Sequence, residues 1–163
     1  MDMQYVLLNP NGRIAQREFW IGVLILIGGN ILSGILPAVG GLLWLFLIYV
    51  GVCVYGKRLH DTGRSAWLHV IPWGITILLS TIGGVLMGGA ILSAVLSGDE
   101  VNPWAFITAG SGFAVMMGLS NLVWLVYTLW VGLSAGQTGA NAYGPAPVKI
   151  IEAAAPDGPD ETT

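Results

Sequence analysis

The sequence has little charge, and this scarcity excludes an ordinary soluble surface. Asp, Glu, Lys and Arg make up 9% of the 163 residues, whereas soluble domains carry roughly 25%. Three long stretches, 19–56, 70–98 and 101–148, contain no Asp, Glu, Lys, Arg or His. Proton- and ion-coupled carriers usually keep an ionisable residue within the membrane as the coupling element. The three uncharged stretches therefore argue strongly against coupled transport.

Cysteine, histidine and basic residues are too few for several other kinds of site. The single cysteine, Cys53, cannot form an intramolecular disulfide, and its apolar surroundings predict a small buried hydrophobic residue. Together with Asp61, His60 and His69 it shows no recognised metal-ligand spacing, so we expect no metal and no other cofactor. The six Lys and Arg residues form no basic patch interleaved with aromatics. The sequence therefore predicts no nucleic-acid partner.

A hydrolytic site is not predicted either. Ser65, His60 and Asp61 are close in the sequence, but adjacent His and Asp side chains point in different directions, and no nucleophile elbow is present. We therefore expect that the chain is not an enzyme. The enzymatic alternative is a membrane-embedded enzyme that uses His60 and Asp61 on a lipid phosphate, and in it His60→Ala abolishes activity without preventing folding.

Apolar runs long enough to cross a bilayer are what the sequence has in abundance. Hydrophobic residues make up 55% of the chain, and about 18 to 20 of them in a row cross a hydrocarbon core. The sequence thus predicts an all-α membrane protein, a four-transmembrane-helix bundle. The expected spans cover about residues 19–36, 39–55, 72–96 and 108–133. Residues 1–151 are expected to form this single domain, and the acidic end, 152–163, to be a disordered tail.

The basic residues fix the orientation of this bundle. With four spans, all six Lys and Arg fall on one side of the membrane, and the opposite side receives the Asp99-Glu100 turn. Because positive charge stays inside, both termini are expected in the cytoplasm. A three-span arrangement is the alternative, and it would place Lys149 and the acidic tail outside.

Small residues recur at a spacing of four in the last two spans, which lets helix backbones approach closely in lipid. They form the rows Ser80, Gly84, Gly88 and Gly89, Ser93, Ser97 and Gly110, Ala114, Gly118. Packing within the chain is the favoured interpretation, and a homodimer interface is the alternative. Asn30 and Asn121 lie at membrane depth, where each amide should find a carbonyl, a hydroxyl or the other amide.

Three short motifs at the predicted cytoplasmic boundary contain most of the polar residues. They are Gly12-Arg13-Ile14-Ala15-Gln16-Arg17-Glu18-Phe19-Trp20, Lys57-Arg58-Leu59-His60-Asp61-Thr62-Gly63-Arg64-Ser65-Ala66-Trp67 and the glycine-rich Gly136-Gln137-Thr138-Gly139-Ala140-Asn141-Ala142-Tyr143-Gly144-Pro145-Ala146-Pro147. On these motifs the chain, from about Tyr5 to Pro147, resembles the bacterial membrane proteins grouped as domain of unknown function 805. The resemblance implies location in the bacterial inner membrane and supports four spans. It implies no reaction.

Antiparallel helices bring the three motifs to one end of the bundle, so we expect them to form one site. Glu18 should bond Arg58 or Arg64, Asp61 should hold the other arginine, and Asn141 and Tyr143 should close over them. In the alternative, Glu18 pairs locally with Arg13 or Arg17. Ser65 is expected to cap the helix that follows it, and Trp20 and Trp67 to act as interface anchors.

Two functional hypotheses follow from this basic face. The leading one is a structural or accessory protein that binds a membrane-protein partner, or a second copy, through its cytoplasmic motifs. The alternative is binding of an anionic phospholipid, whose phosphate suits arginine, or passive transport of a small solute. The candidate residues are Arg13, Arg17, Glu18, Arg58, His60, Asp61, Arg64, Ser65, Asn141 and Tyr143.

The first testable prediction concerns topology. A cysteine introduced at Asp99 should react with an impermeant thiol reagent added to intact cells, because this turn is expected outside. Cysteines at Arg64 and Ala155 should be protected. Labelling at Arg64 in intact cells would contradict the whole arrangement.

Overall fold

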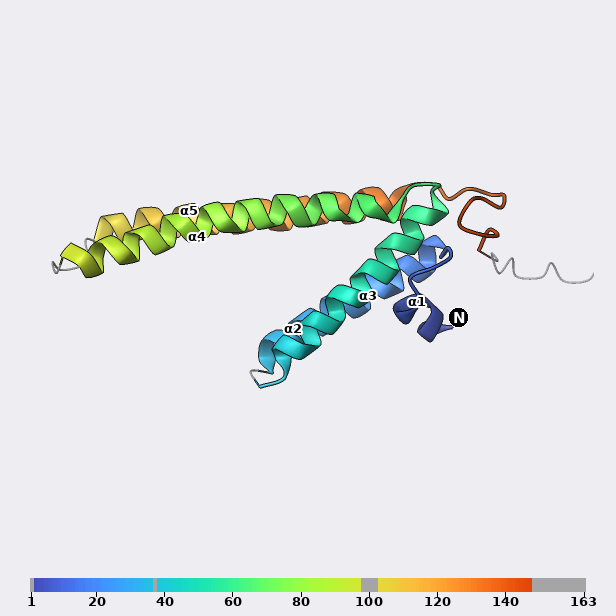
Figure 1. Ribbon diagram of the computed structural model, residues 1–163, viewed down its shortest axis with the longest axis horizontal. Helices are drawn as coiled ribbons and strands as arrows, with labels where there is room; N and C mark the ends of the chain where they lie inside the picture. The colour runs from blue at the N-terminus through green and yellow to red at the C-terminus, as the bar shows by residue number, and fades with distance from the viewer. Residues whose placement is uncertain (1, 37, 98–102, 148–163) are drawn as a thin grey trace, which may run out of the picture. The chain divides into compact units, whose positions relative to one another are not determined.

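The computed structural model describes residues 2–36, 38–97 and 103–147 (Figure 1). Its helices, in chain order, are α1 (Met3–Leu8), α2 (Gln16–Ile35), α3 (Gly40–Asp61), the short 3-10 helix η1 (Ala66–His69), α4 (Val70–Ser97) and α5 (Pro103–Leu133). The described residues contain no β-strand, only an isolated bridge between Asn141 and Gly144. Four helices are long and apolar enough to cross a membrane. These observations confirm the all-α class and four helices of membrane-spanning length and hydropathy. That they cross a membrane as one bundle stays a prediction.

The chain divides into two compact units, and we describe each by itself. The first contains the residues before 64 and after 135, and the second is Arg64–Ala135. The single domain over 1–151 and the side of the membrane on which the termini lie stay predictions. The Asp99-Glu100 turn, Lys149 and the acidic tail 152–163 lie outside the described residues.

In the first unit α2 and α3 form an antiparallel hairpin. Gly22 lies against Val54 and Gly29 against Leu47. The residue numbers of the contacts thus decrease along α3 as they increase along α2, which is the order of antiparallel helices. Near the turn, the Ser33 hydroxyl donates to the Gly40 carbonyl at 2.6 Å. The hairpin therefore closes through small residues, as expected for helices that pack in lipid.

Helix α3 is longer than predicted. The sequence placed the end of this span near Tyr55 because the chain becomes charged there, but the helix continues to Asp61. It can continue because Lys57 and Arg58 are buried and find partners within the protein. Two residues after the last helical residue, Gly63 forms a left-handed C-terminal cap, with a φ of 76° and an N–H that donates to the His60 carbonyl at 3.0 Å.

In the second unit η1, α4 and α5 form another antiparallel hairpin. Ser65 caps η1 as predicted, its hydroxyl accepting from the Trp67 N–H at 3.3 Å. Pro72, where the sequence placed the start of the third span, lies in the first turn of α4. Helix α5 begins at Pro103, five residues before the predicted core at Thr108, because proline also suits its first helical position.

The small residues of this hairpin contribute unequally. Gly83 packs against Phe113 and Met116, and Gly112 packs against Leu86. Of the predicted rows, Gly110 contacts Met87, whereas a Cβ at Gly84, Gly88, Gly89 or Gly118 would meet no atom within 4 Å. The hairpin itself therefore uses different glycines from most of those predicted. Asn30 and Asn121 donate to the carbonyls of Leu26 and Met117, each at 2.8 Å within its own helix.

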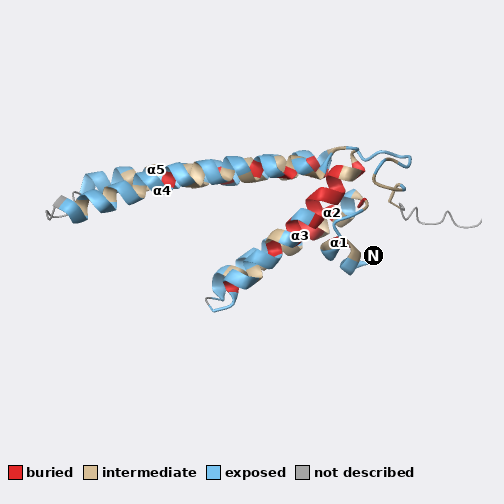
Figure 2. Ribbon diagram, viewed as in Figure 1, coloured by how far each residue is buried: buried red, intermediate tan, exposed pale blue. Residues whose placement is uncertain are grey.

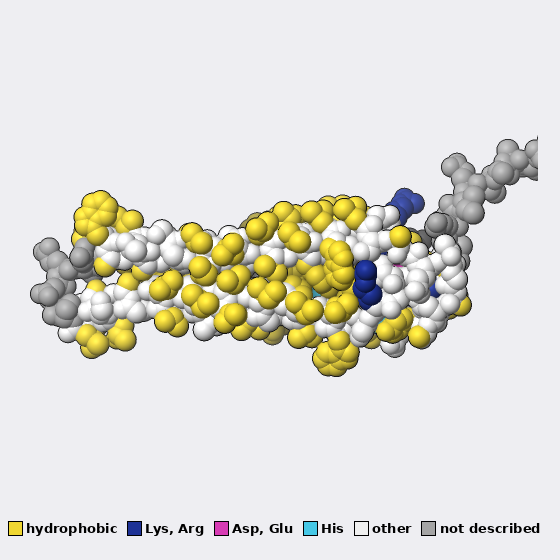
Figure 3. Space-filling view, turned by 90° about the horizontal axis from the view of Figure 1, so that it is seen from above, with side chains coloured by type: hydrophobic (Ala, Val, Ile, Leu, Met, Phe, Trp, Pro, Cys, Tyr) yellow, Lys and Arg dark blue, Asp and Glu magenta, His cyan; other side chains and the backbone are white. Residues whose placement is uncertain are grey.

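Burial is concentrated at one end of α3, whose last two turns are almost wholly buried (Figure 2). Along α4 and α5 most large hydrophobic side chains are exposed. Figure 3 shows a face covered mainly by hydrophobic side chains, with the few basic side chains in view near one end. In a protein of this composition such exposed apolar surface fits contact with lipid.

The second prediction tests the packing of the α2–α3 hairpin. A Cβ at Gly22 would lie 2.8 Å from Cγ1 of the buried Val54, and a β-branched side chain has little freedom to move. Gly22→Ala should therefore lower the melting temperature in detergent, since overpacking costs about 1–3 kcal/mol. Gly28→Ala is the matched control, because Gly28 faces open space. It should gain about 0.5–1 kcal/mol from helix propensity. Equal melting temperatures for the two variants would contradict this packing.

Candidate functional site

The Asp61 carboxylate lies between two arginines at the end of α3. Its Oδ1 accepts from Arg13 Nη2 at 2.9 Å and from Arg13 Nε at 3.1 Å, and its Oδ2 accepts from Arg58 Nη1 at 2.6 Å. All three residues are buried, with exposed fractions of 4% for Arg13, 2% for Arg58 and 4% for Asp61. Charge-assisted bonds of this length are strong, and they are stronger away from water.

Arg13 uses both ends of its guanidinium. Beside the two bonds to the Asp61 carboxylate, it donates through Nη1 to the carbonyls of Gly139 at 2.7 Å and Gly144 at 3.3 Å. Nη2 also donates to the Gln137 carbonyl. Arg13 thereby ties the glycine-rich segment after α5 to the end of α3. Its donors have partners within the protein, so little capacity is left for an external anion.

The segment 136–144 makes further bonds to the end of α3. Gln137 N–H donates to the Asp61 carbonyl at 2.8 Å. The Asn141 amide donates to the His60 carbonyl at 2.9 Å and to Gln137 Oε1 at 2.8 Å. Gly136 passes so close to the Asp61 carboxylate that a Cβ there would collide with Oδ2. A glycine is therefore required at this point of closest approach.

His60 connects all three motifs. Its ring stacks on Tyr143 with 3.8 Å between ring centroids and 5° between planes. Its Nδ1 lies 3.1 Å from the Gly12 carbonyl, which fixes Nδ1 as the protonated nitrogen because a carbonyl only accepts. We call the assembly of Gly12, Arg13, Arg58, His60, Asp61 and residues 136–144 the polar cap.

Helix α1 is fastened beside the polar cap by Lys57. This fully buried ammonium donates to the carbonyls of Tyr5 and of Val6, the latter at 2.9 Å, and lies 4.5 Å from the centre of the Tyr5 ring. Tyr49, two turns earlier on α3, donates to the Leu8 carbonyl at 2.7 Å. A cation at the carboxyl end of a helix is favourable because the helix dipole is negative there.

The predicted pairing of Glu18 is wrong. The ion pairs among the described residues join Asp61 to Arg13 and to Arg58. Glu18 instead accepts from the Ala15 N–H at 3.0 Å and so caps the start of α2. Glu18 therefore caps its own helix and does not pair with a distant arginine. The capping bond joins residues that are close in sequence, so it carries no loop-closure cost. The local pairs with Arg13 or Arg17 are not formed either, and Arg17 is exposed.

The structure brings together five of the predicted site residues: Arg13, Arg58, His60, Asp61 and Asn141. Tyr143 joins them through the stack on His60. Arg64, Ser65 and Trp67 belong to the second unit. There the Arg64 guanidinium lies over the Trp130 ring, 4.6 Å from its centre, and donates to the Ser134 hydroxyl at 3.2 Å. Trp20 makes an edge contact with Phe19.

Several residues of the site escaped sequence reasoning. Tyr5 accepts from the Arg13 N–H at 3.2 Å, and Lys57 holds α1. Gly136 and Gln137 were read only as part of a glycine-rich stretch. The position of Lys57 directly after an apolar run was the one available signal, because a buried ammonium requires acceptors nearby. No group of three or more His, Cys, Asp or Glu residues lies together in the part of the chain that the structure describes.

Residues 7–145 match the model of a protein family described as protein of unknown function (DUF805). The chain belongs to this family. It is also similar to the uncharacterized protein YiiR of Escherichia coli strain K12 and of Escherichia coli O157:H7. Each is 29% identical over 156 residues, which cover 88% of this chain and 89% of the relative. No solved structure matches. The matched range includes every residue of the polar cap, so the cap is part of the DUF805 region.

The third prediction concerns the closest approach in the cap. Gly136→Ala should lower the melting temperature in detergent, because the new methyl group meets a carboxylate that two arginines hold in place. We expect a loss of about 2 kcal/mol, as for other overpacked sites. Gly139→Ala is the control in the same segment, since a Cβ there meets no atom within 4 Å. A Gly136→Ala protein as stable as wild type would show that the segment does not lie against Asp61.

Proposed function

We propose that this protein is a non-enzymatic accessory protein of the bacterial inner membrane. In this proposal the polar cap is a rigid docking platform on the cytoplasmic side, and the four helices anchor it. The observation that carries the proposal is the complete engagement of Arg13: its guanidinium bonds the Asp61 carboxylate and three backbone carbonyls of the segment 136–144.

The charge balance of the first unit supports a structural use of these residues. Arg13, Lys57 and Arg58 are buried there, and Asp61 is the one buried acid among the residues that the structure describes. The surplus positive charge is met by carbonyls from α1 and from residues 137–144. Buried charges with this many partners resist rearrangement, since removing one partner costs about 3–5 kcal/mol. Such an arrangement keeps the polar cap in one conformation.

The position of His60 also supports a structural use. A general base or a nucleophile needs an accessible nitrogen within hydrogen-bond reach of its substrate. One ring nitrogen of His60 is bonded to the Gly12 carbonyl, and one face of the ring is covered by Tyr143. The neighbouring Asp61 is committed to two arginines. Both residues of the enzymatic alternative thus have partners that fix them in place.

The fourth prediction tests the platform by co-purification. The tagged chain, extracted in mild detergent from its host, should retain a defined membrane-protein partner. Asp61→Asn should lose that partner, because the cap opens when its one carboxylate becomes neutral. His60→Phe should keep it, since the ring still stacks on Tyr143, and the exposed Arg17→Gln serves as the surface control. Helix content and elution volume show whether each variant is inserted and folded.

The outcomes separate a platform from an enzyme. Retention of the same partner by wild type, His60→Phe and Arg17→Gln, with loss in Asp61→Asn, supports the platform. The proposal fails if nothing above background accompanies the wild-type chain. It also fails if His60→Phe, inserted and folded normally, abolishes turnover of a membrane lipid, because that result makes the imidazole nitrogens essential.

A further inference from the structure

We infer that the second unit carries a binding site for a single anionic phospholipid, with Arg64 holding the phosphate and a groove between α4 and α5 holding an acyl chain. This inference goes beyond the proposed platform, because it involves none of the residues of the polar cap. It rests on three observations within Arg64–Ala135: the position of Arg64, the composition of the groove, and the ring that joins them.

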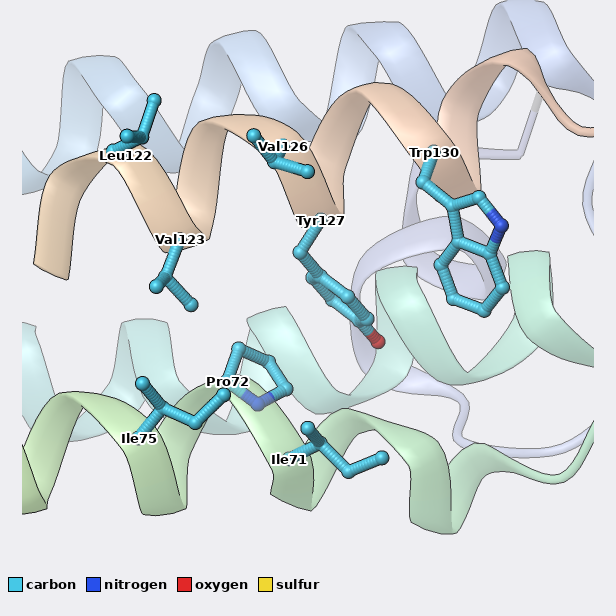
Figure 4. Close-up of a pocket in the computed structure, with 8 residues that line it drawn as sticks. All are labelled: Ile71, Pro72, Ile75, Leu122, Val123, Val126, Tyr127 and Trp130. Carbon is cyan, nitrogen blue, oxygen red and sulfur yellow. The ribbon is translucent and has the colours of Figure 1, made fainter. Parts of the chain in front are cut away.

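The groove has a purely apolar lining. It has a volume of about 440 Å³ and is lined by Ile71, Pro72, Ile75, Leu122, Val123, Val126, Tyr127 and Trp130 (Figure 4). The one hydroxyl among these residues, on Tyr127, lies 3.1 Å from Nδ1 of the buried His69 and is satisfied there. A groove of this kind offers nothing to a polar solute and suits a hydrocarbon chain.

Its contact with Trp130 places Arg64 at the mouth of the groove. The Trp130 ring lines the groove and also carries the Arg64 guanidinium, 4.6 Å from the ring centre. Stacking holds the guanidinium without using its N–H donors. Within the described residues Arg64 donates to the neutral Ser134 hydroxyl and has no carboxylate partner. It thus differs from Arg13 and Arg58, which both form an ion pair with Asp61.

The groove extends over most of one leaflet of a bilayer. Along α5 its lining runs from Trp130 to Leu122, a helical rise of roughly 12 Å, and half of a hydrocarbon core is about 15 Å. An acyl chain that starts under a phosphate at Arg64 would therefore extend along the groove toward the bilayer midplane. Trp67, an exposed residue two positions after Ser65, suits the headgroup layer above the groove.

Charge complementarity selects the headgroup. An arginine without a carboxylate partner carries a full positive charge, and phosphate accepts from a guanidinium at two atoms. A zwitterionic headgroup would add a second cation beside Arg64, whereas phosphatidylglycerol would not. Free phosphate could satisfy Arg64 but would leave the groove empty. The occupant that uses both features is an anionic phospholipid.

The fifth prediction measures retention of this lipid. The full chain in detergent is titrated with dioleoyl phosphatidylglycerol, and bound lipid is counted by native mass spectrometry. Wild type should retain one molecule in preference to dioleoyl phosphatidylcholine. Arg64→Gln should weaken that binding about tenfold, as expected for the loss of hydrogen bonds to a charged group. Arg17→Gln, which removes an exposed arginine of the first unit, should leave it unchanged.

A second pair of variants tests the groove. Val126 lines it and is 58% exposed, so Val126→Trp should fill it without disturbing the core and should prevent retention of the lipid. Leu125, 56% exposed but outside the lining, provides the control Leu125→Trp. Loss of lipid in Val126→Trp, with normal retention in Leu125→Trp, supports the site.

Three results would overturn the inference. Equal retention of both lipids, unaffected by Arg64→Gln, would show only general detergent-phase binding. Displacement of the lipid by free phosphate at comparable concentration would show that the groove contributes nothing. A change of oligomeric state in Val126→Trp, or no effect of this variant on lipid retention, would show that another helix or a second copy occupies the groove.

Discussion

The position of one carboxylate determines how the first unit is built. Asp61 lies at the last residue of α3, between Arg13 and Arg58, and is itself buried. Without it two guanidinium groups would lie next to each other away from water, which costs several kcal/mol per ion. With it, Arg58 can stay in the helix and Arg13 can turn inward from the segment before α2. The helix therefore extends six residues past Tyr55, and the N-terminal segment is held beside it.

One carboxylate does not balance three buried cations, and backbone carbonyls supply the remaining negative potential. This requirement explains the composition of the segment after α5. Arg13 reaches the carbonyls of Gly139 and Gly144 only because the segment folds closely around it, and Gly136 allows the chain to pass the Asp61 carboxylate. The same principle fastens α1, whose Tyr5 and Val6 carbonyls face Lys57. The segment after α5, whose composition suggests an unstructured linker, thus supplies backbone carbonyls as hydrogen-bond acceptors.

The sequence was sufficient to predict what depends on hydropathy and on helix direction. Runs of apolar residues gave the four long helices, and antiparallel order predicted that Arg13, Asp61 and Asn141 would meet. It was insufficient where a local and a distant partner compete. Glu18 was assigned to an arginine by charge, but the nearby Ala15 N–H wins because the bond forms within one helical turn. The end of α3 was placed too early because the carbonyl partners of Lys57 lie more than fifty residues away in the chain.

The contrast among the arginines shows why residue type alone could not assign a ligand site. Arg13, Arg58 and Arg64 all lie in polar motifs at helix ends, and each could hold a phosphate by its chemistry. Folding engages the first two within a buried cluster: Arg13 directs its donors to Asp61 and to backbone carbonyls, and Arg58 donates to the Asp61 carboxylate. Among the described residues Arg64 meets an indole face and a hydroxyl, and neither of these neutralises its charge. A cation that the fold leaves without a counter-charge is the one whose charge an anionic ligand can still satisfy, and here that cation stands at the mouth of an apolar groove.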